Sequence, residues 1–261
     1  MSSLPLVRSH ADDLGLHEAI TKGIIIGCRT GRITGASAVV TGSITATIVD
    51  RWDLPVRLPI RLHYNLTEGK PVSMPQKIPH LVTPSGLFYA WPLLALRLTG
   101  GLIPLAEVRE ELTAQQEKFL SVFGYRPLGF DSHHHIHFHR QLAPLIQSLA
   151  PPQTYIRAAR DLLLATPTLR GWLLREAIRR SRDYQSMSSD SLLDARWLRG
   201  ESLRETLQYL PKSEVIELIW HLAVGNQFPW RTQQLSLLSN PLWWAGEGVA
   251  YRLDRSSDLT K

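Results

Sequence analysis

A dense run of histidines is the feature that most constrains this chain. Five of the ten histidines in the 261 residues fall between His133 and His139. Neutral imidazole is the commonest protein ligand for divalent metals, so a run of this density indicates a metal or catalytic site. A tag remnant or a low-complexity tract is the alternative. We disfavour it because the run is internal and follows an amphipathic helix predicted from Leu105 to Phe123, with Gly124 as its C-cap.

The spacing within the run predicts a strand. Ile136 and Phe138 alternate with His135, His137 and His139, which is a period-2 pattern. Because neighbours on a strand point to opposite faces, only one or two of the histidines are expected to bind a metal directly. The others are expected to support the ligands, to contact substrate or to pack in the core.

The composition describes an ordinary soluble globular protein, with 44% hydrophobic and 20% charged residues. The length is enough to bury a full core. No apolar run approaches the roughly 18 residues that a membrane span requires, and the first apolar stretch is too short for a signal peptide. A single cysteine, Cys28, excludes an internal disulfide and favours the reducing cytoplasm.

The net charge of +6 is consistent with an anionic partner, either nucleic acid or a membrane surface. Seven arginines lie between Arg157 and Arg182, and we favour a solvated helical face for them. The amphipathic segment from Thr168 to Arg182 is expected to pack on the protein, with a basic membrane-surface helix as the alternative. We predict no nucleic-acid partner.

Polar groups recur where the predicted strands end. Asp12 and Asp13 follow the first strand, His63 lies on the polar face of another, and His221 ends a third. For each alone a structural role competes, such as a helix N-cap for the aspartate pair. Together with the histidine run they form the pattern of a site at the carboxyl ends of barrel strands. One aspartate with two histidines leaves coordination positions open, which suits a catalytic metal.

Strands and helices alternate along the chain, which predicts a single α/β domain over residues 1–261 with a largely parallel sheet. We expect this sheet to close as a distorted, TIM-barrel-like (β/α) barrel. Residues 72–103 hold four prolines and are predicted to form an irregular connection, and 256–261 a frayed tail. The predicted strands are 36–40, 41–52, 58–67, 155–159 and 214–221; the predicted helices are 16–28, 105–123, 141–149, 203–210 and 232–238; and a loop is predicted at 181–194.

Five short motifs keep one order over about residues 10 to 240. They are ADDLGL at 11–16 for a known family's ADDFGL, GRIT at 31–34 for its GIVT, LHYNLTEGKP at 62–71 for its LHxxLTxGxP, DSHHHIH at 131–137 for its DSHHHVH, and ELIWH at 217–221 for its ELxxHP. On these motifs the chain resembles the YdjC-like carbohydrate deacetylases, whose best-known members remove acetyl groups from chito-oligosaccharides. The DSHHHxH element is the most specific of the five.

The resemblance implies a distorted (β/α) barrel that binds a divalent metal. The metal in the family is usually described as Mg²⁺, although two imidazoles would suit Zn²⁺ at least as well. Carried over by position, the roles are metal ligand for Asp13, His63 and His133, general base for Asp12, and acid or substrate contact for His221; we add substrate binding for His135, His137 and Arg231.

The predicted function is therefore metal-dependent hydrolysis of the acetyl amide of an N-acetylated amino sugar or glycan. Two departures from the family pattern leave one alternative open, a non-catalytic metal- or carbohydrate-binding barrel. Arg61 stands where glycine commonly precedes Leu-His, and Leu222 replaces the proline after His221. Separately, the basic segment from Thr168 to Arg182 leaves open a deacetylase for a lipid-linked sugar at the membrane surface. The expected partner is a carbohydrate, and a homodimer is left open.

Overall fold

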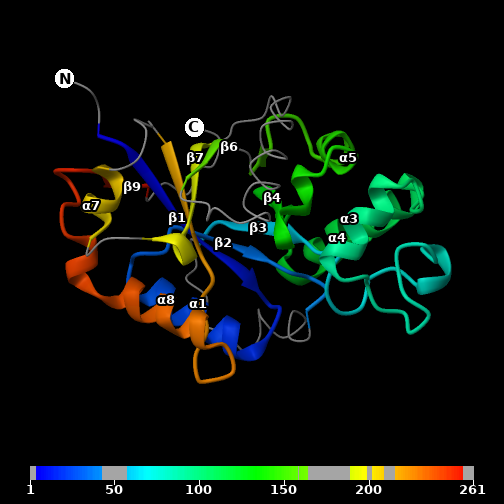
Figure 1. Cartoon of the computed structure of the whole chain (residues 1–261), viewed down its shortest axis with the longest axis horizontal. Coiled ribbons are helices and arrows are strands. Elements are labelled where there is room, and N and C mark those ends of the chain that lie inside the picture. Colours follow the sequence, from blue (N-terminus) through cyan, green and yellow to red (C-terminus); the bar gives the residue numbers. More distant parts are fainter. Residues whose placement is uncertain are drawn as a thin grey trace.

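The computed structural model of the chain describes residues 4–42, 58–157, 159–163, 189–198, 202–208 and 215–254. In this part of the chain nine strands join in one parallel sheet, whose strands are drawn as arrows in Figure 1. The strands are β1 (Leu6–Leu14), β2 (Gly35–Ala38), β3 (Ile60–Tyr64), β4 (Gly129–Ser132), β5 (Tyr155–Ile156), β6 (Ala159–Leu163), β7 (Ser189–Asp194), β8 (Val215–Trp220) and β9 (Arg252–Leu253).

The sheet has the order β5-β4-β3-β2-β1-β8-β7-β6, and β9 pairs with the start of β1. The predicted α/β class is confirmed, but the predicted closed barrel is not seen. Among the described residues no ladder joins β5 to β6, so the sheet forms a curled half-barrel. Closure requires a continuous ladder around the sheet. Only two residues separate β5 from β6, which is too short a connection for two parallel strands to pair side by side.

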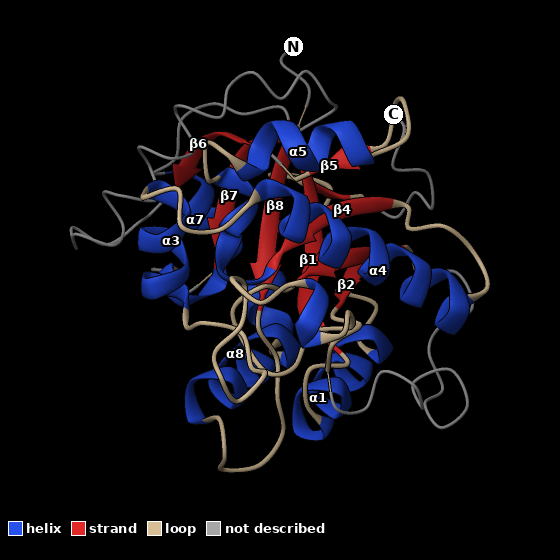
Figure 2. Ribbon diagram, turned by 90° about the vertical axis from the view of Figure 1, so that its right-hand side faces the viewer, coloured by secondary structure: helices blue, strands red, loops and turns tan. Residues whose placement is uncertain are grey.

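Helices cover the sheet on two sides. In Figures 1 and 2, α1 (Glu18–Arg29) and α8 (Pro229–Ser239) lie side by side, while α4 (Leu105–Phe123) and α5 (Leu142–Leu149) lie against the β3–β4 part of the sheet. Of two shorter helices, α3 (Trp91–Thr99) lies on the same side of the molecule as α4, and α7 (Leu203–Gln208) lies on the opposite side (Figure 1). No helix in the described part of the chain is long and apolar enough to span a membrane.

The predicted helix from Leu105 to Phe123 matches α4 at both ends. Gly124 ends it with a φ of 75°, a left-handed conformation that glycine adopts without a Cβ clash. The irregular connection predicted over 72–103 is wrong in part, because α3 lies within it. Pro92 stands in the first turn of α3, where a missing N–H costs no helical hydrogen bond.

One further prediction is wrong in part, and two others fall largely or wholly outside the described residues. The loop predicted at 181–194 is wrong from Ser189 onward, because that segment forms β7. Most of the predicted strand at 41–52 and the whole amphipathic segment from Thr168 to Arg182 lie outside the described residues.

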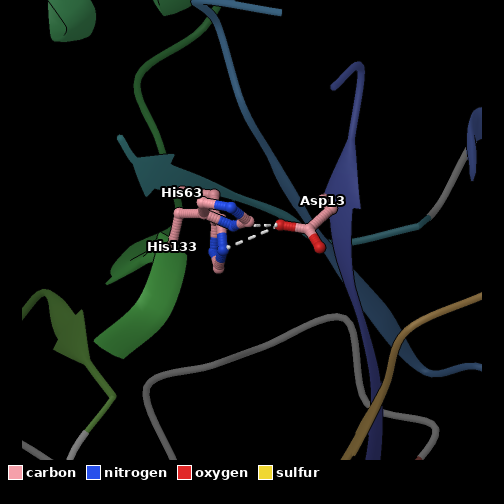
Figure 3. Close-up of side chains that lie close together, drawn as sticks. All are labelled: Asp13, His63 and His133. Carbon is pink, nitrogen blue, oxygen red and sulfur yellow. Dashed lines mark hydrogen bonds and ion pairs between the residues drawn. The ribbon is translucent and has the colours of Figure 1, made fainter. Parts of the chain in front are cut away.

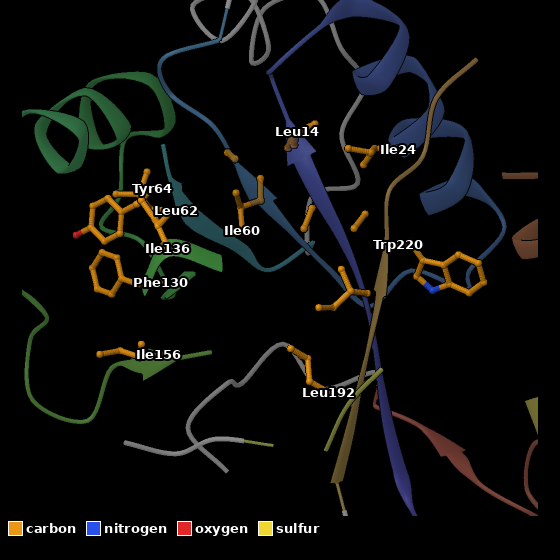
Figure 4. Close-up of a cluster of buried hydrophobic side chains, with 14 of the residues drawn as sticks. Leu14, Ile24, Ile60, Leu62, Tyr64, Phe130, Ile136, Ile156, Leu192 and Trp220 are labelled. Atoms are coloured by element: carbon orange, nitrogen blue, oxygen red, sulfur yellow. The ribbon is translucent and has the colours of Figure 1, made fainter. Parts of the chain in front are cut away.

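The core follows from the parallel sheet, whose strands are buried on both faces. Figure 4 shows apolar side chains of β1, β3, β4 and β8 gathered along the sheet. Tyr64 of β3 stacks on Phe130 of β4 with ring centroids 5.3 Å apart, and Trp220 of β8 meets Trp243 edge to face at 5.4 Å. This packing fixes the strand ends from which the polar residues project.

Candidate metal centre

The register of the sheet brings the predicted site residues to one edge. His63 on β3 pairs with Asp131 on β4, so the carboxyl ends of these strands are level. On the other side of the sheet's centre, Ala11 of β1 pairs with Trp220 of β8, which places Asp12 level with His221. In parallel sheets, ligand and catalytic groups gather at this carboxyl edge.

A bulge in β1 aims the two aspartates. The pairing of β1 with β2 shifts register between Ala11 and Leu14, and Asp13 has a φ of 73°. This left-handed conformation is uncommon for a residue with a side chain and is concentrated at functional sites. A regular strand would point neighbouring side chains to opposite faces, whereas a bulge re-aims one of them. The aspartates lie inside the strand, and the helix N-cap is His17, so the N-cap alternative is wrong.

Three buried donors converge at this edge, as Figure 3 shows. The Nδ1 atom of His133 lies 2.7 Å from Oδ1 of Asp13, and Nε2 of His63 lies 3.3 Å from the same oxygen. Their exposed fractions are 6%, 0% and 2% for His133, Asp13 and His63. The ligand atoms lie within 4.8 Å of one another. One carboxylate oxygen and two imidazole nitrogens in this arrangement fit a divalent cation of the Mg²⁺ to Zn²⁺ range.

A buried carboxylate orients His63. Nδ1 of His63 lies 2.7 Å from Oδ1 of Asp131, and Oδ2 of Asp131 accepts a hydrogen bond from the hydroxyl of Ser37 at 2.5 Å. Burial opposes the charged imidazole, but the Asp131 and Asp12 carboxylates outweigh it and raise the pKa of His63 to about 10. Histidine ligands commonly donate their other N–H to a carboxylate in this way.

The histidine run itself is not a strand. β4 ends at Ser132, and a 3-10 helical segment, η3 (His133–Phe138), follows with left-handed φ values of 55° at His134 and 56° at His135. The strand predicted from the alternation of His135 to His139 is therefore wrong. The two left-handed residues turn the backbone away from the sheet, so His133 directly follows the end of β4.

Asp12 is held by a buried arginine. Arg157, which follows β5, donates from both terminal nitrogens to the two oxygens of Asp12 at 2.8 Å, and it is 0% exposed. The solvated helical face predicted for this arginine is wrong. Burial raises the pKa of Asp12 above that of an ordinary aspartate, and Arg157 offsets part of the shift. Asp12 also lies within 4.8 Å of a ligand atom of His63.

The same guanidinium anchors a wider buried network. Nε of Arg157 donates to Glu217 at 3.0 Å, and Arg61 donates to the same oxygen at 2.6 Å. The hydroxyl of Tyr155 donates to the other oxygen of Glu217. Burial disfavours the charged carboxylate, but the two guanidinium groups outweigh it and hold the pKa of Glu217 far below its usual range. Arg61, which departs from the family pattern, thus has a buried partner.

Arg231 contacts the proposed metal ligand directly. Its Nη2 donates to Oδ2 of Asp13 at 2.7 Å, opposite the oxygen that faces the two histidines. Burial opposes ionisation of Asp13, but His133 and Arg231 outweigh it and lower the pKa of Asp13 well below its usual range. Nη1 of Arg231 is buried and has no hydrogen-bond partner among the described residues. It therefore remains available to a ligand.

His221 follows Trp220, the last residue of β8. Its Nδ1 lies 3.8 Å from Asp194, and its ring lies 5.6 Å from that of Trp230. Burial lowers the pKa of His221 well below its usual value, although Asp194 opposes the shift. Leu222, the other departure from the family pattern, is fully buried beside Gly27 of α1.

The two remaining candidates from the histidine run are both buried. His137 is 0% exposed and its Nδ1 pairs with the hydroxyl of Ser132 at 2.5 Å, so it braces the turn after β4. His135 is 9% exposed, and its ring centroid lies 6.0 Å from that of His137. Its Nδ1 has no hydrogen-bond partner within the described residues.

Four residues of the site carried no predicted role. Asp131 and Glu217 lie inside the quoted motifs, so their acidic side chains in otherwise apolar strands were a usable signal. Arg157 was hidden in a run of arginines, and Asp194 in a segment predicted as a loop. No local pattern distinguishes a buried arginine from an exposed one.

Comparison with known proteins identifies the family. The family model described as YdjC-like protein matches residues 9–248. The chain belongs to the YdjC-like family. A relative from Yersinia enterocolitica serotype O:8 / biotype 1B (strain NCTC 13174 / 8081), named chitooligosaccharide deacetylase, is 32% identical over 97% of this chain and 98% of its own. One of the same name from Escherichia fergusonii is 34% identical over 57% of this chain and 56% of its own.

A solved structure supports the fold. A crystal structure from Enterococcus faecalis V583, of a protein named as a candidate for cellobiose-phosphate cleavage, matches with a TM-score of 0.71. The match covers 96% of this YdjC-like chain and 97% of the other, at 24% sequence identity. At that identity the likeness concerns the fold alone.

The buried ionic network makes a prediction about acid stability. The pKa of Glu217 is lower in the folded protein than in the unfolded chain. The ionised carboxylate therefore stabilises the folded state fully above about pH 4.3, and this stabilisation declines as the pH falls. Glu217→Gln should therefore lower the free energy of unfolding by about 3–5 kcal/mol at pH 7. In urea unfolding from pH 7 to pH 3, the difference in this free energy between wild type and variant should narrow by up to about 1.4 kcal/mol per pH unit below pH 4.3.

Glu205→Gln, at an exposed position of α7, is the control and should leave the pH profile unchanged. A gap between Glu217→Gln and wild type that stays constant down to pH 3 would contradict the ionised state of Glu217.

Proposed function

We propose that this YdjC-like protein is a metal-dependent carbohydrate N-deacetylase that hydrolyses the acetyl amide of an amino sugar or glycan. The observation that carries the proposal is the convergence of Asp13, His63 and His133 at one sheet edge, with Asp12 fixed beside them by Arg157. The names of the relatives from Yersinia enterocolitica and Escherichia fergusonii support carbohydrate deacetylation.

Asp13, His63 and His133 would hold the cation. When bound, a divalent cation polarises the amide carbonyl, lowers the pKa of water and stabilises the negative charge of the transition state. Mg²⁺ and Zn²⁺ are both compatible with the donor set. An amide is unreactive without such assistance, which is why the three donors matter most.

Asp12 would act as the base. Its carboxylate lies beside His63, is fixed by two hydrogen bonds from Arg157, and has a pKa above that of an ordinary aspartate. A carboxylate with a raised pKa accepts a proton more readily, and a fixed one needs no reorientation. Arg157 therefore positions the base and keeps its charge compensated.

His221 would protonate the leaving amine. It follows β8 directly, level with Asp12, and Asp194 lies near its Nδ1. The carboxylate of Asp194 favours the protonated imidazole against the effect of burial. Leu222 packs beside α1, so the departure from proline leaves the imidazole at the strand end.

Substrate contacts would come from Arg231 and His135. Nη1 of Arg231 and Nδ1 of His135 are buried polar atoms without partners in the described residues. A carbonyl or hydroxyl oxygen of the sugar would satisfy Arg231. His137, which is buried behind the turn, would act through the position of His135.

The direct test is acetate release from N-acetylglucosamine oligomers. The metal-stripped protein should release none, and Mg²⁺, Mn²⁺, Co²⁺ or Zn²⁺, added in turn, should restore release with one or more of them. Asp12→Asn should lower kcat by about 10²-fold or more, because the base is lost, while calorimetry still shows metal binding. Glu110→Gln, on the exposed face of α4, is the control and should behave like wild type.

Metal binding without acetate release from any acetylated saccharide would favour the non-catalytic alternative. Full activity of Asp12→Asn would remove Asp12 as the base.

The acid role of His221 makes a prediction that depends on the leaving group. His221→Ala should lower kcat on an N-acetylated sugar by about 10²- to 10⁴-fold, because the amine must be protonated as it leaves. On 4-nitrophenyl acetate, whose phenolate leaves without a proton, the loss should be small. Equal losses on both substrates, or a lowered metal affinity, would argue for a structural role instead.

A further inference from the structure

We propose that Glu68 is a positioning residue for the metal ligand His133, fixing the tautomer in which Nδ1 faces the metal and Nε2 carries the proton. This inference rests on the proposed metal-dependent function. Glu68 lies in the loop after β3, at a position that the family motif LHxxLTxGxP leaves free. The motif alone therefore assigns Glu68 no role.

The geometry around the imidazole carries the proposal. Nδ1 of His133 lies 2.7 Å from Oδ1 of Asp13, and Nε2 lies 3.0 Å from Oε2 of Glu68. A neutral imidazole has one nitrogen free to bind a metal and one that donates a proton. If Nδ1 joins Asp13 at the metal, Nε2–H donates to Glu68. No other hydrogen bond is made by Nε2 within the described residues.

Glu68 accepts from His133 in the way that Asp131 accepts from His63. His63 turns Nε2 toward Asp13 and places Nδ1 on Asp131, whereas His133 turns Nδ1 toward Asp13 and places Nε2 on Glu68. Each imidazole thus has a carboxylate on its outer nitrogen. The two arms differ in burial, because the Asp131 side chain is 0% exposed and that of Glu68 is 56% exposed.

The backbone of Glu68 is held in place. The Asn65 side chain accepts a hydrogen bond from the Glu68 N–H at 3.1 Å and donates to the Glu68 carbonyl at 2.6 Å. Gln115 of α4 bonds both backbone groups of Asn65, at 3.0 and 2.7 Å. Further along the same loop, Glu111 of α4 accepts from the backbone N–H of Val72 and of Ser73.

This clamp distinguishes Glu68 from a typical surface charge. Exposed ion pairs contribute little when both side chains must be ordered to form them. Here one partner is a buried ring, and the backbone of the other is fixed at both its N–H and its carbonyl. Residues that support a metal ligand in this way typically change metal affinity by about 10- to 100-fold when removed.

The test measures metal binding, apart from activity. Calorimetric titration of the metal-free protein with Zn²⁺ and with Mn²⁺ should give a Kd about 10- to 100-fold weaker for Glu68→Ala than for wild type. Glu68→Gln should recover most of the affinity, because its carbonyl oxygen accepts the same hydrogen bond. Glu110→Ala, an exposed residue that pairs with Lys77 on the surface, is the matched control and should bind as wild type does.

The tautomer has its own readout. Nitrogen-15 spectra of the Zn²⁺-loaded, histidine-labelled protein should show His133 with a metal-bound Nδ1 and a protonated Nε2, and His63 with the reverse. An unchanged Kd in Glu68→Ala, or a metal-bound Nε2 at His133, would overturn the proposal for Glu68. Failure of the wild type to bind any metal would instead overturn the proposed function on which it rests.

Discussion

The rest of the site depends on the ionic interactions that Arg157 makes with buried carboxylates. Its guanidinium is fully buried and compensates the charges of Asp12 and Glu217, and its Nη2 lies 3.0 Å from Oδ2 of Asp131. Several buried carboxylates at one sheet edge would repel one another and would be costly to desolvate without such a partner. Arg61 supplies the second positive charge. Because these cations compensate Asp12, Asp131 and Glu217, we propose Asp13 and the two histidines as the donors for the metal ion.

Strained backbone conformations orient the side chains of Asp13 and His133. Of the four non-glycine residues with positive φ in the described part of the chain, three are Asp13, His134 and His135. Such conformations cost of the order of 1–3 kcal/mol each and persist where the surrounding structure holds them. The bulge at Asp13 turns a strand residue toward the two imidazoles, and the turn at His134 and His135 holds His133 directly after the end of β4 at Ser132. The apolar packing of the strands maintains both features.

The sequence predicted what depends on local pattern and missed what depends on distant contacts. The apolar stripe and Gly124 defined α4 to the residue, and polar groups after apolar runs located Asp12, Asp13, His63 and His221 at strand ends. The prolines concealed α3, since proline breaks a helix interior but is tolerated in the first turn. Arg157 could not be recognised as buried, because its partner Asp12 lies 145 positions away along the chain.

The measurement that tests the central claim most directly is anomalous diffraction from crystals of the protein loaded with Mn²⁺ or Zn²⁺. We expect one strong peak bound by Asp13, His63 and His133, at about 2.0–2.2 Å from each ligand atom. Asp12 should remain paired with Arg157 and stay outside the coordination shell. A peak held instead by Asp12, His63 and Asp131, which also lie close enough to share an ion, would contradict the account. In that case Asp12 would be a ligand, and the reaction would need a different base.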